Sequence, residues 1–256
     1  MKTASAPIEQ VGRLLLEIGA QLMSSGADTA RIRKTSVRIA RALGCQAELL
    51  VTPRAIVLTV SDKDGKRCHS ELQRTAPQVI NFRVVSAISR MSWRAQDEQW
   101  SLAEVQDAVA SFDELPRYSR LQVLCAVGLA GTAFCRLLGG GAVEMGVAFV
   151  ATVVGLFVRQ TLVKLRHNDY LCIFAAAVSS GMIAGLAIKL NLGERSHYAL
   201  ATCVLYLVPG VPLINSASDF IDGNHLNGVL RGVHGLIISF AIAAGLLLSL
   251  LVFRSD

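Results

Sequence analysis

The residues of this chain best suited to bind a ligand surround a break in an apolar segment near residue 210. Two prolines and a glycine fall within four positions in the sequence Val208-Pro209-Gly210-Val211-Pro212. Proline has no backbone N–H and displaces the carbonyl four residues earlier, so a regular helix cannot run through this sequence. In hydrocarbon such a break is tolerated where the backbone is buried in protein or lines a cavity. The break therefore predicts a substrate-binding segment, and the alternative is a proline kink that only shapes packing.

Polar and charged side chains in or near the apolar segments extend this candidate site. Asn215 and Asp219 follow the break, and two arginines lie in or at the ends of other apolar segments. Ionisable residues in membrane segments commonly mark substrate pathways. We expect Asn215 to hydrogen-bond a carboxylate and one of the arginines to neutralise its charge. The alternatives are an ion pair of Arg136 with Glu144, and extension of Arg159 to the lipid head groups. The predicted substrate-binding residues are Pro209, Gly210, Pro212, Asn215, Asp219, Arg136 and Arg159.

The sequence shows no arrangement of residues typical of catalysis or of cofactor or metal binding. It contains no hydrolase nucleophile motif, no phosphate-binding loop and no dinucleotide fingerprint. His69 and Glu71 are predicted on one face of a strand, where a solvated polar pair is expected because no third ligand lies nearby. The six cysteines form no Cys-x-x-Cys pair and are expected to be buried free thiols in a reducing compartment. We therefore predict no enzymatic activity, no catalytic residue, no metal and no cofactor.

The composition divides the chain near residue 116. Of its residues 52% are hydrophobic and 17% charged, and residues 1–116 carry 28 of the 44 charged side chains. The net charge of +6 does not indicate nucleic-acid binding, because most of the basic excess lies at the ends of apolar segments, where it meets lipid head groups. The predicted fold is an α-helical integral membrane protein with an N-terminal α+β cytoplasmic domain. Its domains are residues 1–116 and residues 117–256.

Five apolar stretches in the second domain are long enough to cross a bilayer, which takes roughly 20 helical residues. They are residues 121–138, 142–162, 170–188, 198–218 and 232–253. Three consecutive glycines at 139–141 make the first two stretches antiparallel neighbours. The N-terminal stretch carries Arg13 and Glu17 among its apolar residues, so no export signal is predicted and the first domain is expected in the cytoplasm.

The first domain is predicted to contain helices at residues 7–24 and 28–43, the second capped by Asp28. Short strands are predicted at 46–52, 55–60 and 67–72, and another near 81–85 that leads into a helix at 85–95. Ser101 and Glu104 have the spacing of a capping box for a helix to about residue 112. Pro116 marks the domain boundary. The helix at 28–43 carries a basic stripe of Arg31, Lys34, Arg38 and Arg41, which predicts either contact with anionic lipid or an acidic substrate, or an ordinary solvated face.

Three motifs occur in order along the chain: GADTA at 26–30, AIVLT at 55–59 and VPGVPLIN at 208–215, with Asp219 and Gly223 beyond. In these motifs and over nearly its whole length the chain resembles the threonine/serine exporter (ThrE) family, most closely its YjjP-type subunits. The resemblance implies a multi-pass protein of the bacterial inner membrane with a cytoplasmic N-terminal domain. It also implies work with a second, smaller membrane subunit of the YjjB type. Such pairs are associated with succinate export, whereas single-chain members of the family export threonine and serine.

The expected function is therefore that of a subunit of an exporter of small organic acids, with succinate as the expected substrate. The absence of an internal repeat among the five spans agrees with a split transporter, because alternating access usually moves one half against another. Export of threonine and serine is the first alternative. A membrane-anchored enzyme or sensor with its activity in residues 1–116 is the second, and a scaffold for another transporter is the third.

Overall fold

The computed structural model of this chain describes residues 7–112 and 118–254. The chain forms two compact units, one of residues 1–116 with 211–232 and the other of residues 117–210 with 233–256. The predicted boundary at Pro116 lies outside the described residues. Residues 211–232, which the composition places in the membrane part, group with the N-terminal unit.

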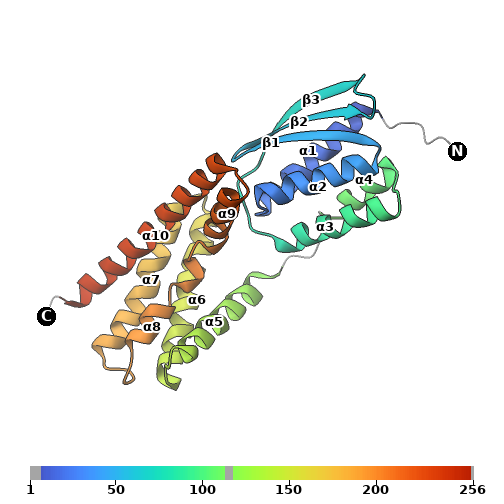
Figure 1. The fold of residues 1–256 in the computed structure, drawn as a ribbon. Helices are drawn as coiled ribbons and strands as arrows, with labels where there is room; N and C mark the ends of the chain where they lie inside the picture. Colours follow the sequence, from blue (N-terminus) through green and yellow to red (C-terminus); the bar gives the residue numbers. More distant parts are fainter. Residues whose placement is uncertain (1–6, 113–117, 255–256) are drawn as a thin grey trace. The chain divides into compact units, whose positions relative to one another are not determined.

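In the first unit, two helices cover one face of a small sheet (Figure 1). The helices are α1 (Ile8–Ser24) and α2 (Thr29–Ala42), and the strands are β1 (Cys45–Thr52), β2 (Ala55–Asp62) and β3 (Cys68–Arg74). The strands are antiparallel and follow in the order β1-β2-β3, with Leu49 opposite Leu58. The two helices and three strands predicted for this region are confirmed within a few residues.

The core of this unit follows from two periodicities. Apolar residues recur at helical spacing along α1, and Leu15, Ile18 and Leu22 are fully or almost fully buried. On β2 every second residue points to the helices, so Ile56 and Val60 are fully buried. These residues belong to one apolar cluster between the helices and the sheet.

The strand predicted near residues 81–85 is wrong. The segment instead begins helix α3 (Phe82–Asp97), because the side chain of Asn81 accepts hydrogen bonds from the backbone N–H groups of Arg83 and Val84. The predicted capping box is present at α4 (Leu102–Ala110), whose N-cap is Ser101. Hydrogen bonds from the Ser101 backbone N–H and hydroxyl hold the pKa of Glu104 below its usual value.

The second unit is built from apolar helices. These are α5 (Arg120–Leu137), α6 (Ala142–Lys164), α7 (Asp169–Lys189), the short helices α8 (His197–Thr202) and η1 (Leu205–Leu207), and most of α10 (His225–Arg254). Helix α6 packs against both α5 and α7. A Cβ atom at Gly131 of α5 would lie 2.7 Å from Thr152 Oγ1 of α6, so glycine allows the two backbones their close approach.

The chain is a multi-pass membrane protein. Among the described residues, α5, α6, α7 and α10 are long and apolar enough to cross a membrane, and a fifth span is obtained if η1 and its preceding helix α8 are joined with α9 (Gly210–Ile221) across a bend. These elements match the five predicted stretches. Helix α10 begins at His225, seven residues before the predicted start of the last span.

All six cysteines are free thiols. Four of them, Cys45, Cys135, Cys172 and Cys203, are buried as predicted. Cys68 and Cys125 are exposed, contrary to the prediction, because the first lies at the start of edge strand β3 and the second on an outer face of α5.

Candidate functional site

The most concentrated set of polar contacts in the first unit surrounds the turn between α1 and α2. Gly26 has a φ of +96° and ends α1, a conformation that favours glycine. Asp28 caps α2 by accepting the backbone N–H of Arg31 at 2.7 Å. The carbonyls of Gly26 and Ala27 and the N–H of Thr29 take no part in this cap, and each binds a side chain from residues 211–232.

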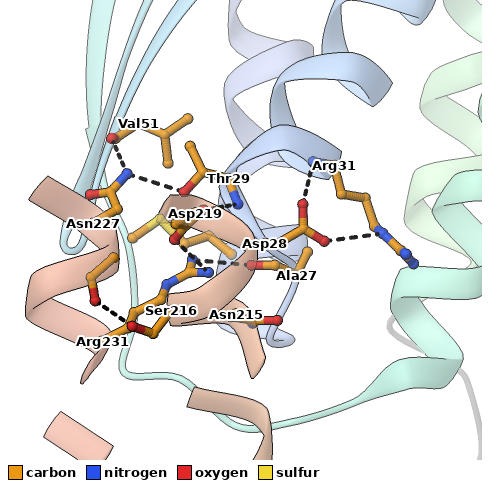
Figure 2. Close-up of polar contacts among 12 residues, drawn as sticks. Ala27, Asp28, Thr29, Arg31, Val51, Asn215, Ser216, Asp219, Asn227 and Arg231 are labelled. Atoms are coloured by element: carbon orange, nitrogen blue, oxygen red, sulfur yellow. Dashed lines mark hydrogen bonds and ion pairs between the residues drawn. The ribbon is translucent and has the colours of Figure 1, made fainter. Parts of the chain in front are cut away.

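Asp219 of α9 lies at the centre of these contacts (Figure 2). Its side chain is completely buried, and its Oδ1 accepts the backbone N–H of Thr29 at 3.2 Å. That N–H is one of the unpaired donors at the start of α2, where a carboxylate also interacts favourably with the helix dipole. The other oxygen, Oδ2, lies 3.1 Å from Nη1 of Arg231 in an ion pair. Asp219 therefore joins α9, α10 and the start of α2.

Arg231 and Asn215 bind the two carbonyls of the turn. Nη2 of Arg231 donates to the carbonyl of Ala27 at 3.2 Å, and Nδ2 of Asn215 donates to the carbonyl of Gly26 at 2.9 Å. The side chain of Arg231 is 13% exposed, so its charge is largely removed from water. A buried cation requires a counter-charge, which Asp219 supplies, and the carbonyl of Ala27 accepts one of the guanidinium N–H groups.

Asn227 of α10 completes the set. Its Nδ2 donates both to Thr29 Oγ1 at 3.1 Å and to the carbonyl of Val51 on β1 at 2.8 Å. We call Asn215, Asp219, Asn227 and Arg231 the polar clamp. Their contacts reach residues 176 to 204 positions away in the chain, so the clamp fastens the α9–α10 segment to the N-terminal fold.

The break predicted at residues 208–212 is present. Pro209 is buried and directly precedes α9, and Val208 before it has an extended backbone conformation. Pro212 instead lies in the first turn of α9, where a proline is tolerated because the N–H groups there have no partner in the helix. One proline therefore breaks the segment and the other belongs to the start of the next helix, which Gly210 begins.

The two predicted arginines belong to the second unit. Exposed Arg136 lies in the last turn of α5 and donates to the carbonyl of Gly140 at 3.3 Å, whereas half-buried Arg159 lies near the end of α6. Because α5 and α6 are joined by a tight turn and run antiparallel, the two arginines lie at opposite ends of the pair. No ion pair joins Arg136 to Glu144 among the described residues, and Glu144 accepts the backbone N–H of Arg195 at 2.9 Å.

The second unit also contains a buried hydroxyl cluster, which we define as Ser180 of α7 and Tyr206 of η1. Their oxygens lie 3.1 Å apart, and Ser180 Oγ donates to the carbonyl of Ala151 at 3.0 Å. Since serine has one proton, Tyr206 is the donor to Ser180. A Cβ atom on Gly155 would overlap both hydroxyl oxygens, so only glycine leaves room for the cluster.

Sequence reasoning selected Asn215 and Asp219 as substrate-binding residues and did not select Thr29, Asn227 or Arg231 for the site. A usable signal existed, because Asp219 and Arg231 are opposite charges on the two arms of a short helical hairpin turned at Gly223. The hydroxyl cluster carried a weaker signal, since serine and tyrosine occur in many apolar helices. Within residues 7–112 and 118–254, no group of three metal-ligating side chains is placed to hold a metal ion.

Comparison with known proteins gives a family match over most of the chain. A family model described as a putative threonine/serine exporter matches residues 13–253. The chain is 31% identical over 249 residues to the protein named "Probable succinate transporter subunit YjjP" of Escherichia coli K12, an alignment that covers 95% of this chain and 94% of the other. It is 30% identical over 242 residues to the protein of the same name from Klebsiella aerogenes, with 94% and 93% covered.

A more distant relative is longer. The chain is 23% identical over 244 residues to the "Probable threonine/serine exporter" of Mycobacterium tuberculosis, an alignment that covers 93% of this chain and 45% of that protein. No solved structure matches the chain.

Proposed function

Because this chain belongs to the threonine/serine exporter family, we propose that it is a subunit of a bacterial inner-membrane exporter of small organic acids. The proposed substrate is succinate, and the proposed partner is a second, smaller membrane subunit of the YjjB type. The substrate and the need for a partner are supported by similarity to two proteins whose names contain "succinate transporter subunit", each covered over more than nine-tenths of its length.

One structural observation carries the transport proposal. A segment apolar enough to cross a membrane is broken at Val208–Pro209, and the helix after the break holds a buried carboxylate, Asp219. Membrane transporters use broken helices of this kind near their substrate sites, where freed backbone groups face a cavity. Because the polar clamp fixes the far half of the broken segment, Pro209 is the proposed hinge of this segment.

The clamp also supports a topology. The turn between α9 and α10 belongs to the same compact unit as the N-terminal fold, so both lie on the same side of the membrane, proposed to be the cytoplasm. Helix α10 has 30 residues, a length of about 45 Å against roughly 30 Å of hydrocarbon. Residues 233–252 suffice to cross, which leaves Arg231 and Asn227 outside the hydrocarbon.

Five of the predicted substrate-binding residues divide into three proposed roles. Asn215 and Asp219 already bind the turn between α1 and α2, so we assign them to positioning the broken segment. Pro209 and Gly210 shape the break itself. Arg159 makes no hydrogen bond or ion pair among the described residues and lies close enough to Tyr206 to act on it electrostatically, so it remains the proposed partner of a substrate carboxylate.

Succinate export is energetically favourable without coupling to another ion. Each negative charge that leaves a cell with an inside-negative potential gains about 2.3 kcal/mol per 100 mV. A dianion gains twice this amount, whereas a zwitterionic amino acid gains nothing from the potential. Export of threonine or serine is the second candidate, favoured by the description of the family and by the mycobacterial relative.

The decisive test is efflux from proteoliposomes loaded with labelled succinate or labelled threonine, with and without the YjjB-type subunit. We expect succinate efflux only when both proteins are present, and faster efflux when an inside-negative potential is applied. Pro209→Ala should slow this efflux, whereas Pro212→Ala, in the first turn of α9, should have a much smaller effect. The proposal would be refuted if threonine but not succinate left the vesicles, or if succinate efflux were the same with and without the YjjB-type subunit.

A further inference from the structure

The basic stripe of α2 does not form one continuous solvated face. Three of its cations, Arg31, Lys34 and Arg38, line a hollow of about 390 Å³ whose other walls come from α3 and α9, including Ser89 and Ser218. The fourth cation of the stripe, Arg41, lines a different hollow. Residues 31, 34 and 38 have the spacing that places side chains on one side of a helix, and the volume is in the range of small-ligand sites, about 300–1,000 Å³.

Two of the three cations are held in place by neighbours. The guanidinium of Arg38 lies 3.6 Å from the centre of the Trp93 ring and donates to Ser92 Oγ at 2.8 Å. Burial lowers the pKa of Arg38 from its ordinary value, yet an arginine remains charged at neutral pH. Its remaining N–H groups make no hydrogen bond to the described residues, so they can bind a ligand. Arg31 is positioned by Asp28, 3.5 Å away, and in Figure 2 its side chain extends away from the polar clamp.

The charge balance of the hollow favours an anion. Two carboxylates also line it, Asp28 and Asp222. Asp28 is already engaged, since it accepts the N–H of Arg31 and pairs with the guanidinium of the same residue. This leaves Lys34 and Arg38 against the carboxylate of Asp222 alone, with hydroxyls from Ser89 and Ser218 as additional donors. Arg and Lys side chains are common ligands of carboxylates and phosphates, and hydroxyl groups can add further hydrogen bonds.

We propose that this hollow binds a small oxyanion, with Lys34 and Arg38 as its principal ligands. The chemistry is shared by a free dicarboxylate or phosphate and by the phosphate of an anionic lipid head group. A bound anion would contact α2, α3 and α9 at once. Because α9 directly follows the Pro209 break, occupancy of the hollow would stiffen the same segment that the polar clamp holds. The proposal does not depend on which substrate the protein transports.

The test is titration of the purified full-length chain with succinate and with inorganic phosphate, followed by calorimetry. Lys34→Gln should weaken binding by about tenfold, because one full charge within contact distance of the ligand is lost. The matched control is Arg33→Gln, which removes a neighbouring exposed cation of α2 that does not line the hollow, and it should change affinity less than twofold. Asp222→Asn should tighten binding several-fold, an effect that misfolding cannot imitate.

Nanodiscs separate the two sources of the anion. If phosphatidylglycerol suppresses succinate and phosphate binding relative to phosphatidylcholine, a lipid head group occupies the hollow; unchanged binding identifies a soluble anion, and both results support the site. The proposal is overturned if neither probe binds saturably in phosphatidylcholine nanodiscs, if Lys34→Gln binds like the unmodified chain, or if Asp222→Asn weakens binding. Binding at a transport site would be equally strong in all three variants, so failure of this site and failure of the transport proposal are distinguishable.

Discussion

The two units pair their buried polar side chains in different ways. In the first unit, the polar clamp uses a full ion pair, Asp219–Arg231, and side-chain bonds to backbone groups of a distant turn. In the second, the hydroxyl cluster of Ser180 and Tyr206 is neutral, and its partner is the carbonyl of a neighbouring helix. The clamp depends on charge, and the cluster depends on the space left by a glycine.

This difference follows from the surroundings. A charge at the centre of a bilayer is expensive, so helices that cross it associate through small residues and neutral hydrogen bonds. A segment that leaves the hydrocarbon can use charges, whose hydrogen bonds are stronger than neutral ones, although desolvation offsets much of the attraction within a buried pair. The two clusters should therefore respond to substitution by different mechanisms and by different amounts.

The largest effect is expected for Arg231→Met. The change leaves Asp219 completely buried without its counter-charge, and breaking a buried ion pair on one side costs about 3–5 kcal/mol. The melting temperature of the detergent-solubilised chain should fall by many degrees, and the yield of folded protein should drop.

The control is the double variant Asp219→Asn with Arg231→Met, which removes both charges. It should be more stable than Arg231→Met alone, because no unpaired charge stays buried. A double variant no more stable than the single one would show that the clamp acts through shape and not through charge, and the contrast between the two units would fail.

The next effect is expected for Gly155→Ala in the second unit. The added Cβ would overlap Ser180 Oγ and Tyr206 OH and lie 2.9 Å from the carbonyl of Ala176, and overpacking of this kind costs about 1–3 kcal/mol. Gly146→Ala in the same helix is the matched control, because nothing lies within 4 Å of its Cβ position. That change should stabilise α6 by about 0.5–1 kcal/mol, since alanine is the better helix former. Equal melting temperatures for the two variants would contradict the close packing.

Much of the fold could be predicted from local patterns. The apolar periodicity of residues 8–22, the Asp28 cap and the capping box at Ser101 each depend on neighbours within a few positions, and all are confirmed. The five apolar stretches are equally local, because length and composition alone define them. The error at residues 81–85 arose where β-branched residues follow Asn81, whose side chain caps a helix there.

The candidate site could be predicted only in part. Pro209, Asn215 and Asp219 were found because a broken apolar segment is visible in the sequence. Thr29, the partner of Asp219, and Gly26, the partner of Asn215, lie about 190 positions earlier, and a single sequence contains no information about that pairing. For the same reason, the polar residues after the break were expected at a substrate, although they bind the chain's own backbone.

Asn215→Ala tests whether Asn215 binds the substrate or only the backbone of the turn between α1 and α2. We expect a loss of stability between those of the largest and smallest effects. The carbonyl of Gly26 would lose its buried donor, which costs about 1–3 kcal/mol. If Asn215 serves the clamp, the melting temperature should fall and the KM for succinate efflux should stay near its original value. A raised KM with an unchanged melting temperature would instead identify Asn215 as a substrate-binding residue.

The smallest effect is expected for Tyr206→Phe. Ser180 keeps its bond to the carbonyl of Ala151 when the tyrosine hydroxyl is removed, so no buried donor loses its partner. The loss should be that of one neutral hydrogen bond, about 0.5–1.5 kcal/mol, which is well below the loss for Arg231→Met. Thermal unfolding of the two variants under one set of detergent conditions measures the comparison directly. A Tyr206→Phe variant as unstable as Arg231→Met would mean that the hydroxyl cluster, despite its neutrality, holds the second unit together as firmly as the charged clamp holds the first.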